Sequence, residues 1–148
     1  MMFLLDTDHI TLMDRGGPVG ENILARLAAL PTDQVAASII SYEEQMRGWL
    51  SAINSIQGVD RQIEGYRRLE RFLEFYCGMS LLPFDVKAAE QFQRLWITRI
   101  RIGTMDLKIA SIAMTNNMTL LSRNSSDFSK VPGLSVEDWS VEQSTSQE

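Results

Sequence analysis

The sequence contains one cysteine, Cys77, and one histidine, His9, among its 148 residues. A single cysteine excludes an internal disulfide and a cysteine-based zinc site, and it makes the cytoplasm the expected compartment. A single histidine excludes a two-histidine metal site and, unless His9 itself serves, a Ser-His-Asp triad. No run of about 18 apolar residues is present, so we expect no membrane partner. Any chemistry therefore depends on other residue types.

The composition is that of a folded domain with an acidic surface. Hydrophobic residues make up 45% of the chain and charged residues 22%, and the formal net charge is −5. We expect one domain over residues 1–139 and a polar tail over residues 140–148. A net negative charge gives no long-range attraction to nucleic acid. Binding to nucleic acid would need a local cause, such as carboxylates that hold divalent cations.

Short apolar segments alternate with segments of helical periodicity along the whole chain. Strands are predicted over residues 2–5, 35–38, 80–83, 118–122 and 134–136. Helices are predicted over residues 10–14, 22–30, from Ser41 onward, 60–76, 85–96 and from about 104 to 117. This alternation predicts an α/β fold with a parallel sheet between two layers of helices. Ligands of such sheets bind beyond the carboxyl ends of the strands.

Two carboxylates follow the first predicted strand. Asp6 comes directly after the buried segment, where the sheet opens, so we predict a functional role for it. For Asp8, two residues later, a role as helix N-cap or in an Asx turn is the better interpretation.

Two further carboxylates lie near predicted helix starts. Glu44 follows Ser41 in an S-x-x-E pattern, which fits either a capping box or a carboxylate directed toward a site. Asp106 heads an apolar helix face, which is unusual for a surface carboxylate. It also fits a first-turn position behind Thr104 as the N-cap, and both roles can hold together.

The stretch after the fourth predicted strand adds Ser122, Asn124 and Asp127. Helix capping by Ser125 or Asp127 is the alternative interpretation there. Carboxylates that converge repel one another, and a hard divalent cation relieves that repulsion. Mg²⁺ prefers oxygen ligands and needs only one or two protein carboxylates. The pattern therefore favours metal-dependent hydrolysis without histidine or cysteine.

Four segments, in this order, resemble those of the PIN-domain ribonucleases, in particular the VapC-type toxins of bacterial toxin–antitoxin pairs. They are "LLDTDHI" (4–10), "SIISYEEQMRG" (38–48), "IGTMDLKIASIAM" (102–114) and "LLSRNSSDFSKVPGLSVEDW" (120–139). The resemblance covers nearly the whole chain. The closing segment is the most specific of the four.

The resemblance implies a PIN-like three-layer α/β/α fold with a parallel sheet of about five strands. It implies an endoribonuclease that depends on Mg²⁺ or Mn²⁺, cleaves RNA with metal-activated water and leaves a 3′-hydroxyl and a 5′-phosphate. It further implies a homodimer inhibited by a cognate VapB-like antitoxin. Carried onto this chain, the expected metal ligands are Asp6 and Asp106. Glu44 completes the acidic site, and Ser122 and Asn124 orient water or ligand.

The chain departs from the family pattern at two positions. Asn124 stands where some members have Asp, which puts the binding of a second metal in doubt. Asp8 stands where the family usually has Asn, which adds a negative charge to the expected site. Among the basic residues, Arg99 and Arg101 are the better candidates for contacts with an RNA backbone, because they are close in sequence to Asp106.

Two other functions remain open at this point. A haloacid-dehalogenase-type phosphatase would use Asp6 as nucleophile and Asp8 as acid/base. A catalytically weak PIN-like binding module would instead use a groove near Met46, Trp49 and Leu50 for a partner helix.

Overall fold

The protein folds around a parallel sheet of five short strands. The computed structural model describes residues 2–141. The strands are β1 (Phe3–Leu5), β2 (Val35–Ser38), β3 (Ser80–Leu82), β4 (Thr119–Leu121) and β5 (Val136–Glu137), in the spatial order β3-β2-β1-β4-β5. Each neighbouring pair is parallel. The predicted α/β class and the strand number are confirmed.

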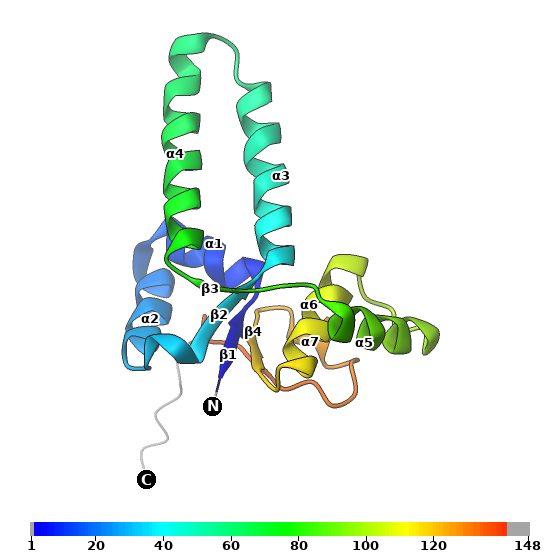
Figure 1. The fold of residues 1–148 in the computed structure, drawn as a ribbon. Helices are drawn as coiled ribbons and strands as arrows, with labels where there is room; N and C mark the ends of the chain where they lie inside the picture. The colour runs from blue at the N-terminus through cyan, green and yellow to red at the C-terminus, as the bar shows by residue number, and fades with distance from the viewer. Residues whose placement is uncertain (1, 142–148) are drawn as a thin grey trace.

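Helices connect the strands and cover both faces of the sheet (Figure 1). They are α1 (Thr7–Arg15), α2 (Gly17–Ala28), α3 (Ile39–Ser55), α4 (Val59–Cys77), α5 (Val86–Ile97), α6 (Thr104–Thr115) and α7 (Ser125–Phe128), with a 3₁₀ turn over Thr32–Gln34. No helix of the described residues is long and apolar enough to cross a membrane. Residues 142–148 of the expected polar tail lie outside the described part of the chain.

The central strand β1 supplies both hydrophobic cores. Successive side chains of a strand point to opposite faces. Leu4 accordingly packs with Leu120 and with α5, α6 and α7 on one face. Phe3 and Leu5 pack with α1, α2 and α4 on the other face. All three β1 side chains are buried, which explains why this segment is continuously apolar.

The sheet changes direction beside β1, and this change positions the site. From β1 the chain proceeds outward to β2 and β3, then returns to pair β4 on the other side of β1. The Asp6 N–H donates to the Leu121 carbonyl at 2.9 Å, which brings the carboxyl ends of β1 and β4 together. Crevices at such switch points are the usual ligand sites of open α/β sheets.

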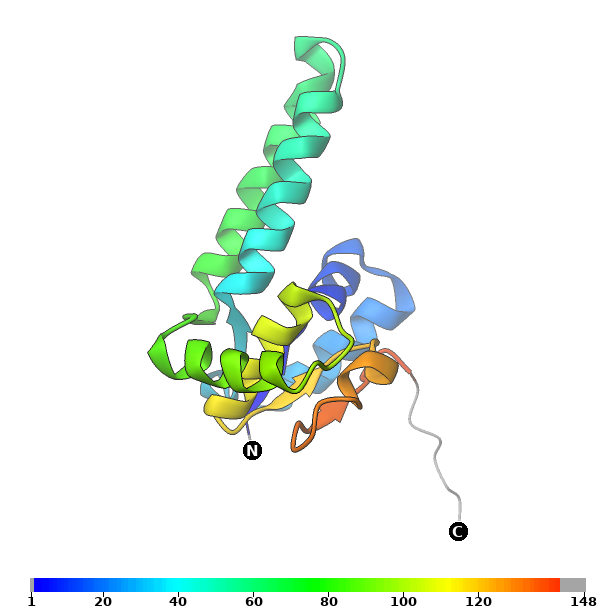
Figure 2. The same cartoon turned by 90° about the vertical axis from the view of Figure 1, so that its right-hand side faces the viewer.

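A hairpin of two long helices, α3 and α4, extends beyond the sheet (Figures 1 and 2). The helices approach closely at Gly65, which is buried. A Cβ atom at this position would lie 3.1 Å from Cγ1 of Ile53. The missing side chain therefore sets the spacing between the two helices.

Several predicted helix starts are wrong. Ser38, not Ser41, caps α3, and it accepts a hydrogen bond from the Ser41 N–H at 3.2 Å. The capping box is therefore absent, because α3 begins directly at the end of β2. Gly103, not Thr104, is the N-cap of α6.

Two other boundaries also shift. Helix α2 begins at Gly17 rather than at residue 22, because Pro18 fits the first turn of a helix. The last strand is Val136–Glu137 rather than residues 134–136.

The fold makes a prediction about the central strands. Leu120 is fully buried in β4, whereas Leu50 of α3 is 47% exposed. Replacing Leu120 by Ala should lower the free energy of unfolding by about 2–5 kcal/mol, because the cavity cannot collapse between the two helical layers. Leu50→Ala, the matched control, should cost less than about 1 kcal/mol. Urea denaturation followed by circular dichroism measures both, and equal losses would contradict this description of the core.

Candidate active site

Asp6 joins the first strand to the first helix. It is the N-cap of α1 and accepts a hydrogen bond from the Thr7 N–H at 2.8 Å. Its second oxygen, Oδ2, accepts a hydrogen bond from the Ser122 hydroxyl at 2.6 Å. The side chain is buried, since the residue is only 5% exposed. Asp6 is therefore both a cap and a fixed carboxylate at the switch point.

Asp8 ties α1 to the loop that follows β4. Its Oδ2 accepts a hydrogen bond from the Arg123 N–H at 2.9 Å and lies 3.2 Å from the Ser122 hydroxyl. The expectation of a local capping role for Asp8 is wrong, because Asp6 caps α1. Asp8 instead fixes residues more than 100 positions away in the sequence.

His9 supports Asp8 from inside the protein. The imidazole is fully buried, and Nε2 lies 3.1 Å from the Trp139 N–H. A backbone N–H can only donate, so Nε2 accepts and Nδ1 carries the proton that is donated to Asp8 at 2.8 Å. No local pattern in the sequence indicates this role, because Trp139 is remote in the chain.

Glu44 and Asp106 approach the same place from two other helices. Glu44 lies in α3, and its buried Oε1 atom has no hydrogen-bond partner among the described residues. Asp106 lies in the first turn of α6. Its Oδ2 accepts a hydrogen bond from the Asn124 amide at 3.4 Å, and the same amide donates to Asp127 at 3.1 Å.

These side chains line one pocket of about 420 Å³, which we call the acidic pocket. Its lining residues are Asp6, Thr7, Asp8, Thr11, Leu12, Arg15, Glu44, Asp106, Arg123 and Asn124. Four of the five predicted site residues thus line the same pocket. The fifth, Ser122, is buried beneath it and bonded to Asp6.

Burial and, to a lesser extent, mutual repulsion disfavour the ionised form of the carboxylates in the acidic pocket. Burial, followed by the negative charge of Asp8, raises the pKa of Asp6 from 3.8 to about 7. Burial also raises the pKa of Glu44, and the charge of Asp106 adds to this effect. The pKa of Asp106 is raised by burial and by the charges of Asp127 and Asp8. A cation in the pocket would therefore be stabilised strongly.

The donor set fits a hard divalent cation. Carboxylate oxygens are the ligands that Mg²⁺ and Mn²⁺ prefer, and the unpartnered Oε1 of Glu44 is free to accept a hydrogen bond from a coordinated water. Within residues 2–141, no three His, Cys, Asp or Glu side chains are close enough to enclose an ion by themselves. An ion here would therefore take one or two carboxylates and complete its shell with water, as Mg²⁺ usually does.

The basic residues at the acidic pocket are not those expected from the sequence. Arg15 and Arg123 line it, whereas Arg99 and Arg101 do not. The carbonyl of Arg101 instead accepts a hydrogen bond from the Lys130 ammonium at 3.3 Å. Contacts of Arg99 and Arg101 with an RNA backbone stay a prediction.

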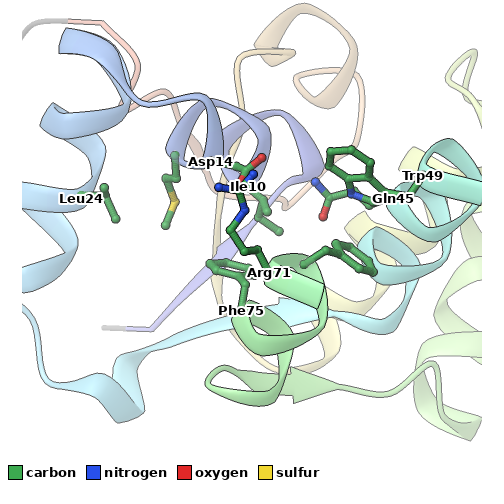
Figure 3. Close-up of a pocket in the computed structure, with 9 residues that line it drawn as sticks. Ile10, Asp14, Leu24, Gln45, Trp49, Arg71 and Phe75 are labelled. Carbon is green, nitrogen blue, oxygen red and sulfur yellow. The ribbon is translucent and has the colours of Figure 1, made fainter. Parts of the chain in front are cut away.

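A second pocket, of about 330 Å³, lies between α1, α2 and the base of the hairpin (Figure 3). We call it the hairpin groove. Trp49, Phe72 and Phe75 form its aromatic wall, and the Arg71 side chain extends from α4 toward Asp14. Leu50, expected beside Trp49, does not line it and is largely exposed.

Comparison with known sequences identifies the family. A family model described as a PIN domain matches residues 3–134. This chain therefore belongs to the PIN-domain family, as the resemblance in sequence predicted.

Individual relatives carry more specific names. "Ribonuclease VapC1" of Rickettsia felis is 35% identical over 86 residues, which cover 53% of this chain and 64% of that protein. This chain thus matches less than two thirds of that relative's length. "Ribonuclease VapC1" of Haemophilus influenzae is 28% identical over 141 residues, covering 94% of this chain and 98% of that protein.

The fold is also found in solved structures. The structure of VapBC2 from Rickettsia felis bound to a DNA fragment from their promoter contains a chain with a TM-score of 0.68 and 25% sequence identity. The match covers 94% of this chain and 99% of that chain.

The raised pKa of Asp6 predicts how the stability of the metal-free protein depends on pH. The folded state binds the Asp6 proton more tightly than the unfolded chain does, so this residue destabilises the fold progressively as pH rises from about 4 to about 7. In EDTA, Asp6→Asn should therefore gain stability relative to the parent across that range, on the order of 2–4 kcal/mol by pH 8. Urea denaturation at pH 5 and pH 8 measures the difference.

The matched control for this experiment is Asp60→Asn, because Asp60 is exposed in the first turn of α4. Its stability difference from the parent should not change with pH. A difference for Asp6→Asn that stays constant or shrinks as pH rises would show that Asp6 is not held near a raised pKa.

Proposed function

We propose that this protein is a Mg²⁺- or Mn²⁺-dependent endoribonuclease toxin that a cognate antitoxin inhibits. The observation that carries the proposal is the convergence of Asp6, Glu44 and Asp106 on one pocket of a PIN-domain fold. The names of the relatives support ribonuclease activity. The raised pKa values of the three carboxylates support the dependence on a cation.

Asp6 and Asp106 would hold the ion, because they approach the acidic pocket from β1 and α6. The ion, when bound, would lower the pKa of a water and stabilise the charge that develops on the phosphodiester. Glu44 would accept a hydrogen bond from that water through Oε1, which lacks a partner in the described structure.

Ser122 and Asn124 would position the ligands. The Ser122 hydroxyl donates to Asp6 and accepts a hydrogen bond from the Asn124 N–H at 3.0 Å. These contacts would leave Oδ1 of Asp6 to the Thr7 N–H and to the ion. The Asn124 amide likewise restrains Asp106. Since Asn124 is neutral, the site has one negative charge fewer than with an Asp there.

The hairpin groove is the proposed contact with the antitoxin. Its aromatic wall suits the apolar face of a partner helix, and the exposed groove lies next to α1, which carries Asp6 and Asp8 at its start. The chain would act as a homodimer, as the resemblance to VapC-type toxins implies.

The acidic pocket favours a nuclease over the phosphatase alternative. Among the described residues, no lysine lines this pocket, whereas the haloacid-dehalogenase-type phosphatases need one beside their two Asp residues. Asp8 is also restrained by three hydrogen-bonding groups, which leaves it poorly disposed to act as a mobile acid/base.

Removing either proposed metal ligand tests the function. Asp6→Asn and Asp106→Asn should each lower Mg²⁺-dependent cleavage of RNA by more than about 100-fold, because even groups that only orient metal ligands contribute about 10- to 100-fold. Circular dichroism should show folded variants. Cleavage is measured with purified, antitoxin-free protein on tRNA, rRNA fragments and mRNA, with Mg²⁺, Mn²⁺ or chelator.

The exposed Asp60 again provides the control, and Asp60→Asn should cleave RNA as the parent does. An active Asp6→Asn variant would refute the assignment. A parent protein that cuts no RNA in Mn²⁺ would favour the binding module. Steady Mg²⁺-dependent release of phosphate from p-nitrophenyl phosphate would favour the phosphatase.

A further inference from the structure

Two arginines lie at the acidic pocket, and the proposed mechanism does not use them. Arg15 belongs to the last turn of α1, and Arg123 follows the end of β4. Both side chains line the acidic pocket, and both residues are exposed. They are the two cationic side chains among its lining residues in the described structure.

The backbone beneath each arginine is fixed to the carboxylates. The Arg123 N–H donates to Asp8 at 2.9 Å, which holds this residue beside the proposed ligands. Arg15 is carried by α1, whose first turn is capped by the Asp6 carboxylate. The backbone of each arginine is thus linked to a carboxylate of the acidic pocket, through the hydrogen bond to Asp8 or through α1.

Both guanidinium groups are available to a ligand. Four of the five arginines of the helical hairpin lie near a carboxylate of their own helix: Arg47 near Glu43, and Arg67, Arg68 and Arg71 near Glu64, at 2.7–4.0 Å. Within residues 2–141, Arg15 and Arg123 form no ion pair with a carboxylate, although four carboxylates line the same pocket. Neighbouring carboxylates therefore do not neutralise their guanidinium charges through an ion pair.

A polyanionic substrate such as RNA needs cationic groups at the acidic pocket. The protein carries a net charge of −5, and the acidic pocket concentrates negative charge where the scissile phosphodiester must enter. One divalent cation can serve the reacting phosphate but not the phosphates on either side of it. A guanidinium binds a phosphate with two parallel hydrogen bonds, which makes arginine the suitable residue.

We propose that Arg15 and Arg123 bind two separate phosphates of a single-stranded RNA next to the phosphodiester that is cleaved. This inference rests on the proposed ribonuclease function. Arg123 follows the strand end that holds Ser122, so it would contact the phosphate nearest the metal. Arg15 lies eight residues along α1 from Thr7, about 12 Å of helix, so it would contact a phosphate farther along the strand.

Binding measured apart from cleavage tests the inference. A fluorescein-labelled single-stranded oligoribonucleotide is titrated with the protein in Ca²⁺, an ion that also takes oxygen ligands, across a series of KCl concentrations. Gel electrophoresis of the recovered oligonucleotide checks that it is intact. Arg15→Gln and Arg123→Gln should each weaken binding several-fold and make the slope of log K against log[salt] shallower by about 0.7.

Three further variants serve as controls. Arg15→Lys and Arg123→Lys keep the charge and should keep the parent slope, while they bind more weakly because the bidentate contact is lost. Arg61→Gln removes one exposed charge near the start of α4, at the far end of the hairpin, and should match the parent.

The result that overturns the inference is an RNA affinity and a salt slope for Arg15→Gln and Arg123→Gln that equal those of the parent. Weakened antitoxin binding with unchanged RNA binding would assign the two arginines to a protein contact, which also overturns it. Failure of the proposed function looks different: the parent would bind RNA with the expected dependence on both arginines and would still not cleave it in Mg²⁺ or Mn²⁺.

Discussion

The structure depends on a carboxylate, Asp6, that is buried beside another negative charge. Asp6 closes the central strand, caps the first helix and accepts a hydrogen bond from Ser122, so it cannot move away from Asp8. Burial removes the water that would solvate the ionised carboxylate, and the negative charge of Asp8 adds to this effect, so the pKa of Asp6 rises to about 7. Such an arrangement costs stability in the empty protein. A cation that neutralised the two charges would stabilise this arrangement, as the proposed metal-dependent nuclease requires.

The parallel topology is what makes this arrangement possible. Strands β1 and β4 pair at the switch in strand order, so their carboxyl ends meet although they are more than 100 residues apart. The network from Trp139 through His9 and Asp8 to Arg123 then locks the closing segment of the chain onto the first helix. The helical hairpin lies outside this network. The groove at its base adjoins α3, which also carries Glu44 of the acidic pocket.

Local patterns predicted the architecture and most of the acidic pocket. The buried segment before Asp6 and the apolar face behind Asp106 are local signals, and both residues line the pocket. Asp8 was misinterpreted because its partners, Ser122 and Arg123, are distant in sequence. The S-x-x-E pattern at Ser41 fitted a capping box as one of two interpretations, but Ser38 at the end of β2 caps the helix instead.

The basic residues at the acidic pocket were also not predictable from local sequence. Arg99 and Arg101 are near Asp106 in sequence, yet Arg15 and Arg123 line the acidic pocket, because α1 and the end of β4 meet there. The periodicity of a single sequence does not indicate which distant segments lie side by side. Here the pairing of strands across the switch point determines which basic residues line the pocket.

The most direct test of the central claim is the position of a bound ion. A crystal of the protein soaked in Mn²⁺ at pH 8, where Asp6 is ionised, should show an anomalous-scattering peak in the acidic pocket, about 2.1 Å from carboxylate oxygens of Asp6 and Asp106. Saturating Mn²⁺ that leaves this pocket without a peak, or that binds only at other carboxylates, would contradict the account.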